Sequence, residues 1–248
     1  MKVSVLIACF NERQTIEQIV QSVRRSPIEQ IEIIIVDDCS NDGTTTILKQ
    51  RVSSFVDKII YQPQNRGKGA ALRAGLAAVT GSIVVIQDAD LEYAPSEYSL
   101  LLAPIFSEKA DVVLGTRFAG KRARKFTYFW QRGGNKFATL LSNACTGLKL
   151  TDIQTGYKAF RASLVPGLTI CENRFGVDAE LIAKFARNRC RIHEVGITYT
   201  ARTYAEGKKV RWKDGLRAIY VILKYNLFDR ARQVHPFCAP GAGKPVHF

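Results

Sequence analysis

The sequence predicts an α/β fold in which a mostly parallel central sheet is flanked by helices. Apolar, β-branched stretches alternate with helix-like stretches through residues 3–114. The strand-like stretches are continuously apolar, which is typical of parallel strands covered on both faces. The chain has 248 residues, of which 46% are hydrophobic, and this suits one domain with a sizeable core.

The elements of the first half follow from these patterns. Ile16, Ile19, Val20 and Val23 recur at helical spacing, so a helix is expected over residues 15–23. Ligands of such sheets bind beyond the carboxyl ends of the strands, so chemistry is expected there. Strands are expected at residues 3–8, 31–36, 56–61, 83–87 and 111–114, with further helices at residues 44–52 and 68–79.

The pattern changes after Gly115. Residues 121–136 are basic and aromatic and contain no acidic residue. The last residues, 235–248, are rich in proline and glycine and are expected to form a loose tail. Between these stretches we expect helices at 130–145, 178–188 and 214–228, a turn-rich stretch at 147–156 and a strand pair within 191–199.

Charge is distributed unevenly along the chain. The formal net charge is +14, made up of −2 over residues 1–100 and +16 over residues 101–248. Such an imbalance indicates an anionic partner, which could be nucleic acid, a phosphate-rich ligand or acidic lipid. The six cysteines form no CxxC pair, so we expect reduced thiols and a cytoplasmic protein. We expect neither a secretory leader nor a membrane-spanning segment.

Carboxylates gather at the end of the fourth predicted strand. Asp88 and Asp90 are two residues apart, so in an extended segment they point the same way, and Glu92 follows at the same spacing. Paired carboxylates repel each other unless they share a divalent cation such as Mg²⁺ or Mn²⁺, which can neutralise a diphosphate leaving group. The alternative is that these aspartates cap turns.

Two further motifs follow strands or precede a helix. Asp37 and Asp38 end the second strand and could bind a ribose or base, or could form an Asx turn with residues 41–43. Residues 65–69 form a glycine-rich turn before a helix, where free N–H groups and Lys68 would suit a phosphate. The alternative there is a glycine turn with solvated basic residues. The spacing matches neither the dinucleotide fingerprint nor the P-loop.

These motifs together resemble a known family. The segments 8–12, 36–40, 65–70 and 88–90 resemble, in order, the signature of family 2 glycosyltransferases, which have the GT-A fold. The segments 115–118, 152–158 and 202–209 resemble the subgroup of dolichol-phosphate mannosyltransferases and related polyprenyl-phosphate glycosyltransferases. The resemblance covers roughly residues 2–225, and one departure is Ala8, where the family usually has proline.

The resemblance implies a single domain over residues 1–228, with a nucleotide-sugar-binding half (1–115), an acceptor-binding half (116–228) and a loose tail (229–248). It also implies site residues. The implied nucleotide-sugar-binding residues are Ala8, Phe10, Glu12, Asp37, Asp38, Lys68, Asp88, Ala89 and Asp90, and the implied metal ligands are Asp88, Asp90 and Glu92. The implied acceptor-phosphate-binding residues are Arg117, Arg132, Lys136, Arg202 and Lys208, and the implied catalytic residues are Asp90, Arg117, Asp152 and Arg202.

The expected activity is transfer of a hexose, with inversion, from GDP-mannose or UDP-glucose to dolichyl or polyprenyl phosphate. A phosphate monoester, with a second pKa of about 6, is already ionised near neutral pH and needs no strong base. Asp152 would then orient the acceptor or a lysine, or simply cap a turn. Alternatively, the acceptor is a hydroxyl and Asp152 is the base. A polyanion-binding module would leave the acidic clusters at the strand ends unexplained.

The basic part also predicts contact with a membrane. Residues 202–232 hold nine Lys+Arg and three acidic residues, and apolar residues recur at helical spacing from Trp212 to Leu227. Such a helix, with the basic aromatic run 121–130, could lie on an anionic surface. The alternative is that its apolar stripe packs on the core. We expect a peripheral protein on the cytoplasmic face that could have a separate membrane-anchoring protein as a partner, and no nucleic-acid partner.

Overall fold

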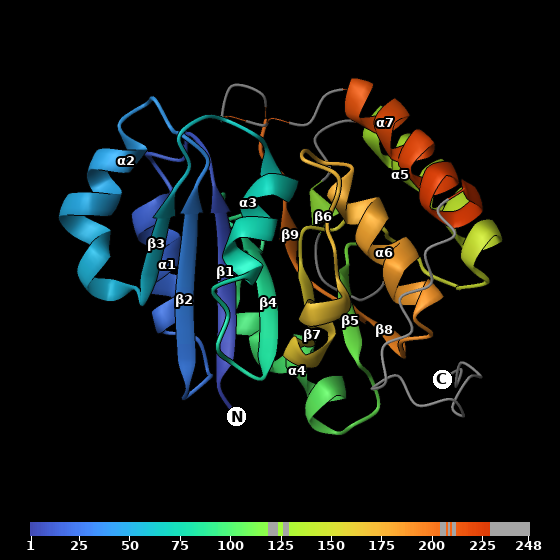
Figure 1. Cartoon of the computed structure of the whole chain (residues 1–248), viewed down its shortest axis with the longest axis horizontal. Helices are drawn as coiled ribbons and strands as arrows, with labels where there is room; N and C mark the ends of the chain where they lie inside the picture. Colours follow the sequence, from blue (N-terminus) through green and yellow to red (C-terminus); the bar gives the residue numbers. More distant parts are fainter. Residues whose placement is uncertain (119–123, 126–128, 204–206, 208, 210–211, 229–248) are drawn as a thin grey trace.

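The computed structural model describes residues 1–118, 124–125, 129–203, 207, 209 and 212–228. A seven-stranded sheet with the order β3-β2-β1-β4-β7-β5-β8 forms its centre (Figure 1). Every pairing is parallel except those of β7, which runs antiparallel to both β4 and β5. The strands of this sheet are β1 (Val3–Cys9), β2 (Ile31–Asp37), β3 (Lys58–Tyr61), β4 (Ile83–Asp88), β5 (Val112–Thr116), β7 (Lys158–Arg161) and β8 (Ile192–Gly196).

Helices cover both faces of the sheet, and the strand side chains divide between two cores. In β1, Leu6 packs into the core that contains α3 and α6, whereas Val5 and Ile7 pack into the core that contains α1 and α4. This alternation along a fully buried strand explains why the sequence is apolar without interruption. The helices are α1 (Ile16–Arg24), α2 (Thr44–Ile47), α3 (Lys68–Leu76), α4 (Tyr98–Phe106), α5 (Phe129–Thr146), α6 (Val177–Arg187) and α7 (Trp212–Leu223).

Shorter elements complete the chain. A second sheet pairs β6 (Arg124–Lys125) with β9 (Tyr199–Thr200) in parallel. The 3-10 turns are Ser53–Phe55, Pro95–Glu97 and Ala162–Gly167, and the π-helical turns are Leu48–Val52 and Lys224–Phe228. In the second half, α5 and α7 pack against each other at one end of the molecule, far from α2 (Figure 1).

The predicted mostly parallel sheet flanked by helices is confirmed, with three differences. Two strands are present where a strand pair was expected over residues 191–199, but they do not pair with each other, because β8 pairs with β5 and β9 pairs with β6. The helix expected over residues 44–52 changes to π-helical geometry at Leu48. Helix α4 and strand β7 were not anticipated. The predicted tail, residues 229–248, lies outside the described residues.

No helix within the described ranges combines the length and the hydrophobicity required to cross a bilayer. Among the same residues, Cys9, Cys39, Cys145, Cys171 and Cys190 are free thiols, as expected from their spacing.

Candidate active site

A cavity of about 840 Å³ opens at the carboxyl ends of β1, β2 and β4. Its lining comes from both halves of the chain, namely from segments between residues 8 and 93 and from segments between residues 117 and 218. Three residues other than glycine, Asn11, Cys39 and Leu91, adopt positive φ angles of 50°, 61° and 63° just after these strands. Backbone strain of this kind is stored where a functional site requires it.

Asp38 organises the wall formed by the glycine-rich turn. Its Oδ1 accepts a hydrogen bond from the N–H of Arg66 at 2.8 Å, and its Oδ2 accepts one from the N–H of Gly67 at 2.6 Å. Gly67 has a φ of 95°, and a Cβ there would lie 2.6 Å from the carbonyl oxygen of Asn173, so glycine is required. This turn leads directly into α3 and sets the position of Lys68.

Glu12 connects the start of the chain to the segment after β9. Arg202 binds it through two parallel bonds, Nη1 to Oε2 at 2.9 Å and Nη2 to Oε1 at 2.8 Å, and Lys209 donates to the same carboxylate. Burial would raise the pKa of Glu12, but the bonds and charges of Arg202 and Lys209 outweigh it and lower that pKa. The Arg202 Nη2 also lies 3.4 Å from Asp90 Oδ2, so one guanidinium serves two acidic residues.

Asp88 and Asp90 both line the cavity, with different neighbours. The ammonium of Lys68 contacts Asp88 Oδ1 at 2.7 Å and Asp178 Oδ2 at 3.9 Å, and Asp178 also pairs with the fully buried Lys158. Burial, followed by the charges of Asp88 and Glu92, raises the pKa of Asp90 to about 7. Burial and the neighbouring carboxylates therefore both disfavour the ionised form of Asp90.

The carboxylate of Glu92 holds β9 and the segment that follows it. Its Oε2 accepts a hydrogen bond from the Tyr199 hydroxyl at 2.9 Å, and its Oε1 accepts one from the N–H of Arg202 at 2.9 Å. Glu92 thereby places the guanidinium of Arg202 between Glu12 and Asp90.

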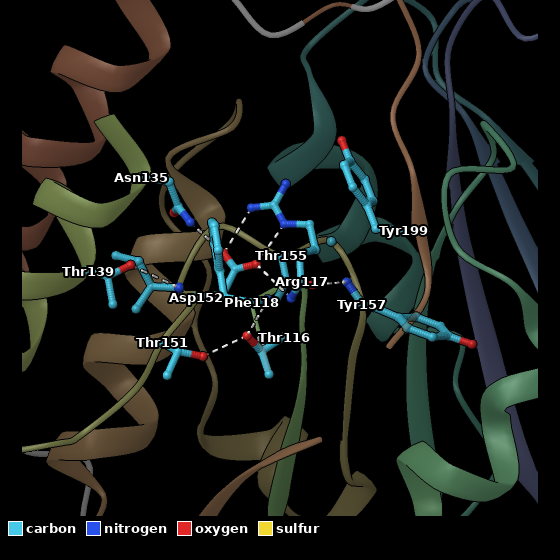
Figure 2. Close-up of polar contacts among 12 residues, drawn as sticks. Thr116, Arg117, Phe118, Asn135, Thr139, Thr151, Asp152, Thr155, Tyr157 and Tyr199 are labelled. Atoms are coloured by element: carbon cyan, nitrogen blue, oxygen red, sulfur yellow. Dashed lines mark hydrogen bonds and ion pairs between the residues drawn. The ribbon is translucent and has the colours of Figure 1, made fainter. Parts of the chain in front are cut away.

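Arg117, which also lines the cavity, is held by Asp152 (Figure 2). Its Nε and Nη2 donate to the two oxygens of Asp152 at 2.6 and 2.8 Å, and its backbone N–H donates to Oδ2 at 3.2 Å. Asn135 Nδ2 donates to Oδ1 at 2.9 Å. Burial would lower the pKa of Arg117, but the charge of Asp152 outweighs it and holds that pKa well above its usual value. The guanidinium also lies 5.0 Å from the ring centre of Tyr199.

The sequence of residues 4–167 matches the family described as Glycosyl transferase family 2. The chain belongs to this family. It is 29% identical over 213 residues to an undecaprenyl-phosphate 4-deoxy-4-formamido-L-arabinose transferase of Pseudomonas savastanoi pv. phaseolicola, covering 83% of this chain and 60% of that protein. It is 27% identical over 233 residues to a dolichol-phosphate mannosyltransferase of Pyrococcus furiosus, covering 91% of this chain and 64% of that protein. The chain thus spans less than two thirds of these relatives.

Solved structures of a glucosyl-3-phosphoglycerate synthase from Mycobacterium tuberculosis share the fold. One, in complex with UDP, has a TM-score of 0.69 at 22% identity and covers 90% of this chain and 79% of that chain. Another, in complex with Mn²⁺, UDP and glucosyl-3-phosphoglycerate, has a TM-score of 0.67 at 21% identity, with coverages of 91% and 80%. The similarity confirms the predicted GT-A fold for this glycosyl transferase family 2 chain.

A divalent metal, which the family resemblance implies, fits two of the three predicted ligands. Asp88 and Asp90 line the cavity and supply hard oxygen donors. Mg²⁺ is often held by one or two carboxylates together with phosphate oxygens of the substrate, so two are sufficient. Glu92 is engaged with Tyr199 and Arg202, and no group of three or more His, Cys, Asp or Glu residues in the described part of the chain is arranged to hold a metal. The roles of Asp88, Asp90 and Glu92 as metal ligands stay predictions.

The structure brings most of the predicted site residues to one cavity. The predicted residues that line it are Ala8, Phe10, Glu12, Asp38, Lys68, Asp88, Ala89, Asp90, Glu92, Arg117 and Arg202. Asp37 does not line it, because its carboxylate is buried in the turn after β2, where it accepts hydrogen bonds from Ser40 and Thr45. Asp152 is fully buried behind Arg117.

Two predicted acceptor-phosphate residues, Arg132 and Lys136, are exposed on α5 and do not line the cavity. Lys208 lies outside the described residues. The roles of all these residues in binding or catalysis stay predictions.

The sequence did not predict several residues of the site. Asn135 and Asp178 line the cavity, and Glu194 accepts hydrogen bonds from the N–H groups of Thr151 and Asp152. No signal in the sequence marks them, because each acts on a partner that is distant in the chain. Lys209, in contrast, lies within the basic segment 202–209 and could have been paired with an acidic residue of the strand ends.

Proposed function

We propose that this chain transfers a sugar from a nucleotide diphosphate sugar to a polyprenyl phosphate, with inversion at the anomeric carbon. The donor would be bound at the carboxyl ends of β1, β2 and β4, and the acceptor phosphate near Arg117. Family membership supports the reaction class, and the names of the two curated relatives favour a lipid phosphate as acceptor.

The environment of Asp152 favours a phosphate acceptor over a hydroxyl acceptor. Both of its oxygens accept hydrogen bonds from Arg117, and Oδ1 accepts a further one from Asn135. A carboxylate that accepts four hydrogen bonds and is fully buried behind a guanidinium is poorly placed to take a proton from a hydroxyl acceptor. A phosphate acceptor needs no such base, and it suits the guanidinium that Asp152 holds in place.

The donor side has the charges that a nucleotide diphosphate requires. Asp88 and Asp90 would hold Mg²⁺ or Mn²⁺, which would neutralise charge on the departing diphosphate. Arg202, fixed by Glu12 and by the segment that Glu92 fastens, adds a guanidinium on the same side of the cavity. These residues would bind and orient the donor while Arg117 steers the anionic acceptor towards it.

The proposal includes contact with an anionic membrane surface, where a polyprenyl phosphate would be found. Large apolar side chains are exposed on α5 and α7, which pack against each other: they are Phe137, Leu140, Leu216 and Tyr220. Arg132 and Lys136 are exposed on the same α5. Exposed apolar residues together with basic residues are typical of helices that lie in a lipid interface.

The test uses purified protein with Mg²⁺ or Mn²⁺, a polyprenyl phosphate and a panel of labelled nucleotide sugars that includes GDP-mannose and UDP-glucose. We expect transfer to the lipid from one donor, a product of inverted anomeric configuration, and loss of transfer in Asp90→Ala. The matched control acceptor is the polyprenol without its phosphate, which should accept no sugar. Transfer to the polyprenol, or to no lipid with any donor, would contradict the proposal.

A further inference from the structure

Asn135 is a buried side chain of the cavity wall with one unsatisfied end. It lies on α5, is 4% exposed and lines the cavity. Its Nδ2 donates to Asp152 Oδ1 at 2.9 Å, whereas its Oδ1 is buried and accepts no hydrogen bond from any described residue. Because burying an unpaired amide oxygen is costly, such an atom in a binding cavity indicates a missing donor.

The orientation of this amide is fixed by its neighbour. The Asp152 carboxylate can only accept hydrogen bonds, so the Nδ2 end of Asn135 must face it, and the Oδ1 end points away (Figure 2). Rotating the amide would place its oxygen against a carboxylate that already accepts three bonds from Arg117. Whatever approaches Oδ1 must therefore carry a hydrogen-bond donor.

This requirement excludes the phosphate groups of both substrates. Ionised phosphates and diphosphates offer only acceptor oxygens, and the chain of a polyprenyl phosphate offers no polar group. The transferred sugar carries several hydroxyl groups, and the ribose of the nucleotide carries two, so comparing the nucleotide sugar with its bare diphosphate separates these donors. Asn135 and Arg117 bind the same carboxylate, so Oδ1 is anchored beside the guanidinium proposed to receive the acceptor phosphate. In the proposed reaction, the transferred sugar would meet its acceptor there.

We propose that Asn135 Oδ1 accepts a hydrogen bond from one hydroxyl of the transferred sugar and helps to determine which sugar the enzyme uses. This inference rests on the proposed function, because it requires a nucleotide sugar in the cavity. Asp152 then has two effects, since it positions the guanidinium of Arg117 and the amide of Asn135 together.

The test compares binding of a nucleotide sugar with binding of its nucleotide diphosphate, by calorimetry without an acceptor. GDP-mannose with GDP and UDP-glucose with UDP are the probes, together with single-deoxy analogues of each sugar. In Asn135→Ala we expect affinity for the nucleotide sugar to fall about tenfold to a hundredfold, with little change for the diphosphate. One deoxy analogue should bind the native protein weakly and lose nothing further in the variant.

Asn143→Ala is the matched control. Asn143 lies on the same helix, and both ends of its amide are satisfied by Leu150, with distances of 2.8 and 3.0 Å. It does not line the cavity, so its replacement should alter thermal stability without changing the ratio of sugar to diphosphate affinity. Asn135→Ser provides a second variant if the alanine protein does not fold.

The possible outcomes separate this inference from the proposed function. If the native protein binds a nucleotide sugar but Asn135→Ala weakens sugar and diphosphate equally, or weakens neither, Oδ1 faces water and the inference is wrong. If every deoxy analogue loses the same additional factor in the variant, the inference is also wrong. If the native protein binds no nucleotide sugar, the proposed function fails and the inference fails with it.

Discussion

Four N–H groups donate to the carboxylate of Asp152, so at the scale of single residues this aspartate is a positioning group. We predict that Asp152→Asn raises the KM for polyprenyl phosphate at least tenfold, because a neutral amide no longer fixes the guanidinium of Arg117 through charged bonds. Steady-state kinetics over pH 5.5–9 check this, and the shape of the pH profile should be unchanged.

A catalytic base would give a different result. Its removal would lower kcat by a factor on the order of 10²–10⁴, and the limb of the pH profile that reports its ionisation would disappear. Thr151→Ala is the matched neighbour, since the backbone N–H of Thr151 would still bind Glu194 in this variant. It should leave the KM for the acceptor near its native value.

The sequence was informative about residues that follow strands. Asp38, Asp88 and Asp90 were predicted because the carboxyl ends of parallel strands meet at one edge of a sheet, whereas Glu12 was implied by the family resemblance of segment 8–12. All four line one cavity. Glu92 was grouped with Asp88 and Asp90 on spacing and on the family resemblance, whereas its carboxylate accepts hydrogen bonds from β9 and the segment that follows it. Contacts between segments this distant in the chain leave no local pattern.

At the scale of elements, the first turn of α3 lies against the backbone that precedes α6. A Cβ on Gly69 would lie 1.9 Å from the carbonyl oxygen of Glu172, and this backbone is held because Glu180 accepts hydrogen bonds from the N–H groups of Cys171 and Glu172. We predict that Gly69→Ala lowers the free energy of unfolding by about 1–3 kcal/mol, through overpacking against a segment that cannot yield. Urea unfolding measures this change.

Gly133→Ala is the matched control, and it is expected to change the free energy of unfolding in the opposite direction. Gly133 is an exposed residue within α5, and a Cβ there would meet nothing within 4 Å. Alanine should raise the free energy of unfolding by about 0.4–1 kcal/mol, because it restricts the unfolded chain and suits a helix. If both variants changed stability in the same direction, the packing argument for Gly69 would be wrong.

The elements that the sequence did not predict have identifiable causes. Helix α4 begins after a proline-led turn and contains Pro104, and prolines normally argue against a helix interior. Strand β7 is four residues long and begins with the fully buried Lys158, which pairs with Asp178 of α6. A lysine normally predicts a solvent-exposed position. Because Lys158 is instead buried in an ion pair, the sequence pattern did not reveal this interior strand of the sheet.

At the scale of the whole molecule, the excess of positive charge lies in the half that contains α5 and α7, and these helices expose large apolar side chains. We predict that the protein binds vesicles containing anionic lipid and that the binding weakens as salt is raised from 0.05 to 0.5 M, because screening shortens the range of the attraction. Leu140→Asp and Leu216→Asp should each weaken binding about tenfold, since each removes an apolar contact and adds a negative charge. Co-sedimentation with vesicles measures the affinity.

Phe55→Asp is the control that separates two effects on vesicle binding, namely a substitution on α5 or α7 and a change in net charge. Phe55 is 56% exposed, much as Leu216 is 58% exposed, but it belongs to the turn that follows α2 and its π-helical extension, at the end of the molecule away from α5 and α7 (Figure 1). Its substitution changes the net charge by the same amount, so a purely electrostatic attraction would weaken equally in all three variants. If α5 and α7 face the lipid, Phe55→Asp should bind vesicles almost as well as the native protein. Equal losses in all three variants would instead mean that the protein is attracted by charge without a preferred face.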